Sequence, residues 1–132
     1  MRIANQVARI VFGLGFLVFG LNGFLDFIPP PAQPLPGPVV QFAAALMNSG
    51  YLFQLIKGTE VVVGLLLLAN RFVPLALVLI APVVVNIVAV HLFLDRSGLA
   101  VALVVLALEL HLAWAHRKAY RPMLVAHATV EV

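Results

Sequence analysis

The chain has 132 residues, of which 64% are hydrophobic and only 10% are charged. In a soluble domain about a quarter of the residues would be charged, so this composition does not fit that class of protein. With a mean hydropathy of +1.13, it indicates a single integral membrane domain, and the formal charge of +3 then marks cytoplasmic loops rather than nucleic-acid binding. The absence of cysteine excludes disulfides, thiolate nucleophiles and cysteine-ligated metal clusters within this chain.

Four apolar segments are long enough to cross a hydrocarbon core of ~30 Å as helices that rise ~1.5 Å per residue. They are Asn5–Phe27, Tyr51–Asn70, Phe72–Leu94 and Gly98–His116. The connections between the last three are so short that these helices must be antiparallel neighbours. The sequence therefore predicts an all-α fold, an up-down four-helix membrane bundle formed by a single domain of residues 1–121, with a short cytoplasmic tail at 122–132.

Glycines 13, 20 and 23 fall on one face of the first span, and small residues let helices approach closely. We expect that face to meet the bundle.

A proline-rich segment, DFIPPPAQPLPGP (residues 26–38), separates the first two spans and prevents a helix from continuing. The apolar stretch VVQFAAALMNSG, Val39 to Gly50, follows it and has about half the length needed to cross a membrane. It predicts a short interfacial or re-entrant helix on one membrane face, either packed there without function or contributing to a site.

Basic residues near the ends of the spans predict the orientation, because cytoplasmic loops are enriched in lysine and arginine. On one side fall Arg2, Arg9, Arg71, Arg117, Lys118 and Arg121. Lys57 and Arg96 fall on the other side. We therefore expect an inner, bacterial-type cytoplasmic membrane, with both termini cytoplasmic and the proline-rich segment outside.

Three polar residues on three different spans are predicted to share one mid-membrane layer. Counted from the outer ends of their spans at ~1.5 Å per residue, Glu60, Asn86 and Glu109 lie about 12 to 16 Å deep. Ionisable residues are costly in hydrocarbon, and two acids in one apolar layer resist being ionised together. The layer is interpreted either as a site that handles a proton or ligand, or as a structural layer that fixes the register of the bundle.

A second polar group is expected above this layer, where Asn22, Asp26, Lys57 and His91 approach the outer ends of their spans. This group fits two interpretations equally well: the entrance to a site for a polar headgroup, and the ordinary hydrated end of a helix bundle. Asp26 is the predicted partner of Lys57. Any bound molecule is expected to enter from the outer side or laterally between helices, with its polar end near Glu60.

Arg9 is the candidate cation for the buried acids, although it lies nearer the cytoplasm than they do. The candidate ligand-binding residues are thus Glu60, Asn86, Glu109, Lys57, Asp26, His91 and Arg9. No catalytic residue is assigned. His91 and His111 differ too much in depth to ligate one haem iron, so no metal is expected.

Several of these residues resemble the DoxX-like family of small four-helix membrane proteins. The likeness is carried by Arg9 with GLGFLVFGLNGF, by the proline-rich segment and short helix, and by GTEVVVGLLLLANR before an alanine-rich third span. Glu60, Gly64 and Arg71 match the family's E-x-x-x-G pattern and terminal arginine, and Arg9 matches the arginine of its first span.

Some DoxX-like proteins are similar to the small membrane subunit of a thiosulfate:quinone oxidoreductase, and others are linked to membrane redox complexes that handle thiol stress. The resemblance therefore implies an accessory role that faces a quinone. The absence of cysteine argues against direct thiol chemistry in this chain.

Three functions remain open at this stage. The first is a non-autonomous subunit, or a binder of quinone or lipid, with a membrane redox partner and at most an accessory role in a quinone-linked oxidoreductase. The second is a proton-coupled transporter or channel for a small solute, acting as a homo-oligomer. The third is a passive structural partner within the lipid bilayer.

Overall fold

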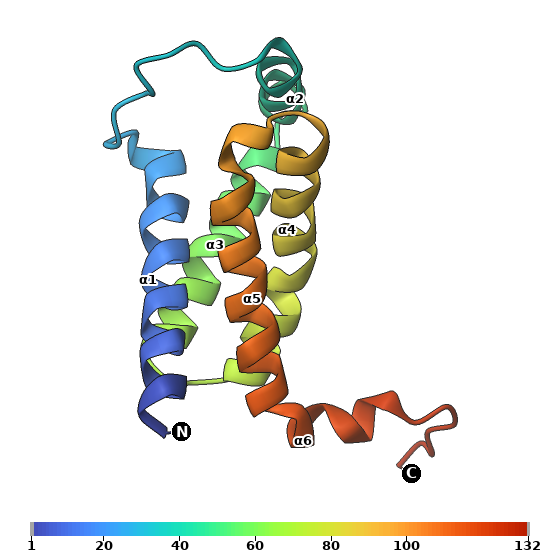
Figure 1. Cartoon of the computed structure of the whole chain (residues 1–132). Helices are drawn as coiled ribbons and strands as arrows, with labels where there is room; N and C mark the ends of the chain where they lie inside the picture. Colours follow the sequence, from blue (N-terminus) through green and yellow to red (C-terminus); the bar gives the residue numbers. More distant parts are fainter. Residues whose placement is uncertain (1, 132) are drawn as a thin grey trace.

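The computed structural model describes residues 2–131, and within them every regular element is a helix, as the sequence predicts. The elements are α1 (Arg2–Leu25), α2 (Gly37–Asn48), α3 (Leu52–Leu68), α4 (Val73–Phe93), η1 (Arg96–Gly98), α5 (Leu99–Ala115), α6 (Arg117–Tyr120) and η2 (Arg121–Leu124). Figure 1 shows that α1, α3, α4 and α5 run lengthwise through the molecule, while the N-terminus and the C-terminal segment lie at the same end.

Three segments are long and apolar enough to cross a membrane, namely α1, α4 and Arg96–Ala115. A fourth span is reached if the bent pair of α2 and α3 is counted as one. By itself α3 has 17 residues and is shorter than the predicted Tyr51–Asn70. The chain leaves the helix at Ala69, and Asn70 and Phe72 then adopt positive φ angles of 55° and 53° in the turn to α4.

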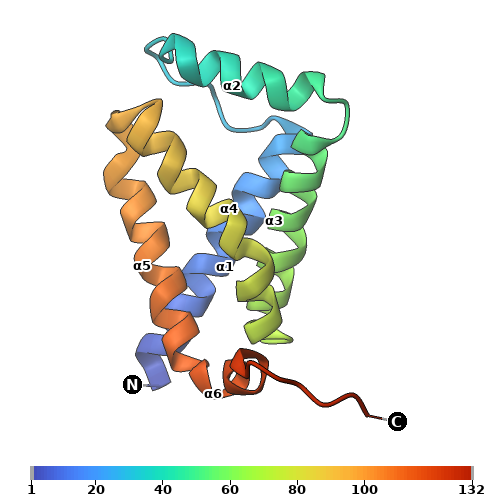
Figure 2. The ribbon, with the colours of Figure 1, turned by 90° about the vertical axis from the view of Figure 1, so that its right-hand side faces the viewer.

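α2 turns by 92° from α3 and has no buried residue. Figure 2 shows it lying across the ends of the long helices. It begins at Gly37, with a proline in the first turn, where the fixed φ of proline suits a helix start and its missing N–H costs no intrahelical bond. The predicted short helix is therefore present, and its perpendicular course follows from the break at residues 49–51.

The buried core is small for a chain of this length. It includes Phe12 and Phe16 of α1, whose rings pack edge-to-face with centroids 4.9 Å apart, and Ile80 of α4. Large apolar side chains also cover the outside, with Phe93 81% and Val101 69% exposed. Such a surface would associate in water, so it is compatible with a membrane location.

α1 and α3 pack most closely, and glycines make this approach possible. A Cβ atom at Gly64 would lie 2.6 Å from the backbone nitrogen of Leu17, and one at Gly20 would lie 2.9 Å from that of Val61. Real Cβ atoms do not approach backbone atoms so closely, so neither position accepts a side chain without movement. The prediction that the glycine face of the first span meets the bundle is confirmed.

The Tyr120 hydroxyl of α6 connects the C-terminal segment to the start of α4, because it donates to the carbonyl of Pro74 at 2.9 Å. Beyond Leu124 the chain has no further helix up to residue 131. Figure 1 shows this last segment running away from the long helices.

Candidate functional site

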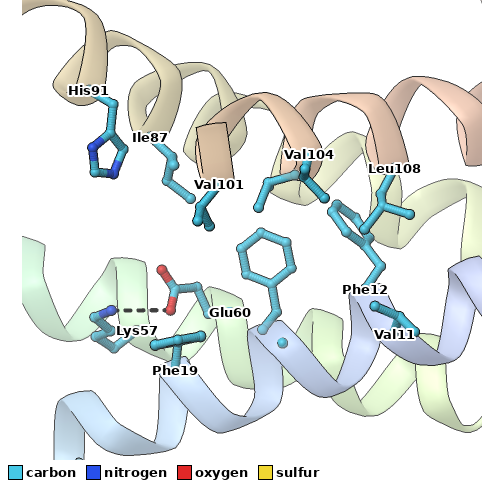
Figure 3. Close-up of a pocket in the computed structure, with 13 residues that line it drawn as sticks. Val11, Phe12, Phe19, Lys57, Glu60, Ile87, His91, Val101, Val104 and Leu108 are labelled. Carbon is cyan, nitrogen blue, oxygen red and sulfur yellow. Dashed lines mark hydrogen bonds and ion pairs between the residues drawn. The ribbon is translucent and has the colours of Figure 1, made fainter. Parts of the chain in front are cut away.

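A cavity of about 420 Å³ lies among α1, α3, α4 and α5. Its walls are mainly apolar and include Phe12, Phe16 and Phe19 of α1 and Val101, Val104 and Leu108 of α5. Polar side chains lie at one end only, where Lys57 and Glu60 of α3 face His91 of α4 (Figure 3). The cavity is therefore amphipathic, with a long apolar body and one polar end.

The cavity opens sideways between α1 and α5. Its floor is buried, since Phe12 is 3% and Phe16 is 6% exposed. Its rim is not, since Phe19 is 58% and Val104 is 58% exposed. In a bilayer this opening would face the hydrocarbon.

Lys57 and Glu60 form an ion pair at the polar end, with the Lys57 Nζ donating to the Glu60 Oε2 at 3.2 Å. The two residues are three apart on one helix and so share a face. Two glycines of α1 make room for both side chains. The aliphatic part of Lys57 passes over Gly23, and a Cβ placed at Gly20 would lie only 3.0 Å from the Cβ of Glu60. The pair brings no net charge to the cavity.

His91 is fixed by the turn that follows α4. Its Nδ1 lies 3.0 Å from the carbonyl oxygen of Asp95, and its ring packs against Gly98 so closely that a Cβ there would collide with it. The turn is itself held by Asp95, whose carboxylate accepts from the Ser97 backbone N–H at 3.0 Å and from the Ser97 hydroxyl at 2.6 Å. The orientation of the imidazole is thus set by backbone and turn geometry.

The structure brings together Lys57, Glu60 and His91, three of the seven predicted ligand-binding residues. Asp26 is not the partner of Lys57. It is exposed at the end of α1 with a φ of 50°, while Lys57 bonds to Glu60 on its own helix. An ion pair with a neighbour three residues away needs no approach of two elements, which explains why it forms instead.

The predicted mid-membrane layer is wrong for Asn86, because Asn86 is exposed and does not line the cavity. The buried face of α4 carries Ile80 and Val84. Asn86 follows Val84 by two residues, which is a rotation of about 200° around a helix. The count along the helix axis did not include this rotation, and the side chain points out of the bundle.

Glu109 is buried but does not line the cavity either, so the two acids do not share one site. Its Oε2 has no hydrogen-bond partner among residues 2–131. Burial and, to a smaller extent, the Glu109 carboxylate raise the pKa of Tyr120 in α6.

Arg9 is not a counter-ion for either acid. Its guanidinium donates to the carbonyl of Leu67 and, at 3.4 Å, to that of Leu68. These carbonyls belong to the last turn of α3, where backbone acceptors lack partners within the helix. Arg9 of α1 therefore caps the C-terminal end of α3.

The aromatic side of the cavity on α1 and the contact of Gly98 with His91 were not predicted from the sequence. Phe12, Phe16 and Phe19 recur at intervals of four and three, a spacing that places them along one helix face and could have indicated it. Gly98 carries no comparable signal, because only the fold brings it to His91.

Residues 2–131 contain no cluster of three or more histidine or acidic side chains that could hold a metal ion. Comparison with family models, with characterised proteins and with solved structures finds no match to this chain.

Proposed function

We propose that this chain is a DoxX-like integral membrane protein that binds an amphipathic molecule, a quinone or a lipid, as a non-autonomous component of a membrane redox process. The observation that carries the proposal is the cavity with a single polar end. Its volume of about 420 Å³ falls within the range of small-molecule sites, roughly 300 to 1,000 Å³. Apolar walls with a few convergent polar groups are the usual form of such sites.

The sideways opening supports a ligand that is dissolved in the bilayer. A molecule of this kind can reach the cavity between α1 and α5 without passing through water. Its apolar part would lie against Phe12 and Phe16, and its polar end would meet Lys57 and Glu60. A water-soluble solute would instead need an open polar path.

In the membrane, α1, α3, α4 and α5 would form an up-down bundle of four spans, with α2 on the outer face. The 17 residues of α3 extend about 26 Å, close to the ~30 Å of the hydrocarbon core. The perpendicular course of α2 and its lack of buried residues suit an interfacial position. The basic residues near the two termini support a cytoplasmic location for both ends.

The outer face of α4 supports contact with a second copy of the chain. Exposed residues recur along it at intervals of four, three, four and seven: Leu75, Leu79, Pro82, Asn86 and Phe93. An amide facing hydrocarbon without a partner is costly. Because an asparagine side chain both donates and accepts hydrogen bonds, two copies of Asn86 would satisfy each other across a symmetric interface.

The binding proposal is tested with a matched pair of glycine variants. Gly15 lines the cavity, and Gly58 lies outside it on α3; a Cβ at either position meets nothing within 4 Å. Gly15→Leu should fill the cavity from α1 without disturbing the helices, whereas Gly58→Leu should leave the cavity open.

Each protein would be purified in mild detergent, and its bound small molecules would be extracted and quantified by mass spectrometry. We expect a quinone or a defined lipid to co-purify with the wild type and with Gly58→Leu, and to fall about tenfold in Gly15→Leu, as expected for a loss of ~1.4 kcal/mol in binding. Equal retention in all three proteins, or no retained molecule in the wild type, would contradict the proposal.

A further inference from the structure

The hydrogen-bonding character of His91 follows from its contact with Asp95. A peptide carbonyl can only accept a hydrogen bond, so the His91 Nδ1, which lies 3.0 Å from the Asp95 carbonyl oxygen, must carry the proton. In the neutral imidazole the Nε2 is then an acceptor. Figure 3 shows the ring extending from α4 toward Lys57 and Glu60, at the polar end of the cavity.

Glu60 offers a second acceptor to the cavity. Its Oε2 accepts from Lys57, while its Oε1 receives no hydrogen bond from any of residues 2–131. In Figure 3 this second oxygen points away from Lys57, toward α4. The side chain is 6% exposed and lines the cavity, so a ligand is the natural donor to this atom.

Within residues 2–131 the polar end therefore presents two acceptors that receive no hydrogen bond, the Glu60 Oε1 and the His91 Nε2, beside an ammonium group that already has a partner. A headgroup that only accepts, such as the carbonyl end of an oxidised quinone, can use Lys57 but leaves both acceptors unpaired. A phosphate headgroup would also bring negative charge against Glu60, which the neutral ion pair does not offset. A headgroup with hydroxyl groups can donate to both acceptors.

We propose that the cavity selects an amphiphile whose polar end donates hydrogen bonds through hydroxyl groups. This inference rests on the proposed function and names the ligand class of the same site. The chemistry is shared by two sources, the reduced, quinol form of a quinone and the glycerol headgroup of an uncharged lipid. Glu60 and His91 are the residues that determine the specificity.

The test compares ligands that differ only in their hydroxyl groups. The protein is reconstituted in nanodiscs free of quinone, and equilibrium binding is measured without oxygen. The probes are a short-chain quinol, its oxidised quinone, its dimethyl ether, a monoacylglycerol and the dimethyl ether of that lipid. We expect at least one hydroxylated probe to bind about tenfold more tightly than its ether, since each lost hydrogen bond is worth roughly that factor. The quinol arm and the glycerol arm then show which source the protein prefers.

Two variants assign the preference to the proposed atoms. His91→Phe keeps a ring of similar size without an acceptor, and Gly98→Ala displaces the ring through the collision of its Cβ. Both should reduce the preference for hydroxyl over ether, whereas Gly58→Ala, outside the cavity, should keep it. Circular dichroism verifies that each variant is folded, and a misfolded Gly98→Ala leaves His91→Phe as the deciding variant.

Equal binding of hydroxylated and etherified probes to the wild type would overturn this inference while leaving the binding function intact. A preference that survives in folded His91→Phe at its full size would also overturn the assignment. If no probe binds and Gly15→Leu retains the same molecules as the wild type, the proposed function itself fails.

Discussion

Arg9, Glu60 and Glu109 are all costly to place in an apolar span, and each has a different environment. Glu60 pairs with Lys57 at a cavity, and Glu109 is buried with a carboxyl oxygen that has no partner among residues 2–131. Arg9 bonds to backbone carbonyls at the end of α3. Of the three, only Glu60 lines the cavity.

Removing the Arg9 guanidinium should destabilise the fold without altering the cavity. Arg9→Leu removes the guanidinium donor from the Leu68 carbonyl and leaves the Leu67 carbonyl with the Asn70 N–H alone, and we expect the free energy of unfolding in detergent to fall by about 1 to 3 kcal/mol. Arg2→Leu, at an exposed position, should change it by less than about 0.5 kcal/mol. Ligand retention should be unchanged in both. Equal stability of the two variants would show that the Arg9 contacts contribute nothing.

The turn after α4 should respond to acid through Asp95. Hydrogen bonds from the Ser97 hydroxyl and backbone N–H hold the pKa of the Asp95 carboxyl below its ordinary value of 3.8. The charged form is thus favoured in the folded chain, so its contribution is complete above pH ~4 and is lost as the pH falls through the lower, folded-state pKa.

Between pH 5 and pH 2.5 the melting temperature of the wild type should therefore decrease more than that of Asp95→Asn. The other acids are common to both proteins, so the difference isolates Asp95. Identical decreases would show that these hydrogen bonds do not distinguish the folded state.

At the scale of the helices, the contact between α1 and α3 determines where the polar end of the cavity lies. Glycines on α1 let α3 approach until Lys57 and Glu60 lie over Gly23 and Gly20. α1 and α5 meet less closely, and the opening of the cavity lies between them. The same four helices thus form a tight seam between α1 and α3 and an open cavity between α1 and α5.

The tight seam predicts opposite effects for two glycines on α3. A Cβ at Gly64 meets the backbone of α1 at 2.6 Å, so Gly64→Ala should push the helices apart and lower the free energy of unfolding by about 1 to 3 kcal/mol. Gly58→Ala meets nothing within 4 Å and should raise it by about 0.5 to 1 kcal/mol, because alanine favours a helix over glycine. Denaturation of both variants in the same detergent is the measurement. A stabilised Gly64→Ala would mean that the seam is looser than the structure has it.

At the scale of the whole molecule, most of the surface is apolar, and Asn86 is a polar group within it on α4. If a second copy covers this face, Asn86→Leu should shift the protein from dimer to monomer and weaken association by about 1 kcal/mol, the magnitude of interhelical polar contacts in membranes. Dimerisation would be followed by energy transfer between labelled copies in nanodiscs.

Asn86→Gln, which keeps both donor and acceptor, serves as the control and should remain dimeric. A monomeric wild type, or an Asn86→Leu variant that dimerises as well as the wild type, would exclude a contact between copies through this face.

From the sequence one can predict the all-helical class, the approximate ends of each helix and the proline break before α2. These properties are local, because the length of an apolar run and the position of prolines act on the chain where they occur. The packing of the glycine face of α1 against the bundle was also predictable, since small residues recur on one side of that helix.

The direction in which each polar side chain points could not be predicted, because it depends on how the helices pack. α4 and α5 are apolar on all sides, so their sequences carry no amphipathic pattern that reveals the buried face. Their rotation is set by how side chains of neighbouring helices interlock, and this packing turned Asn86 outward, kept Glu109 away from the cavity and brought His91 to Lys57 and Glu60. The candidate site therefore became smaller than predicted, because the position of a residue along a helix does not fix the direction of its side chain.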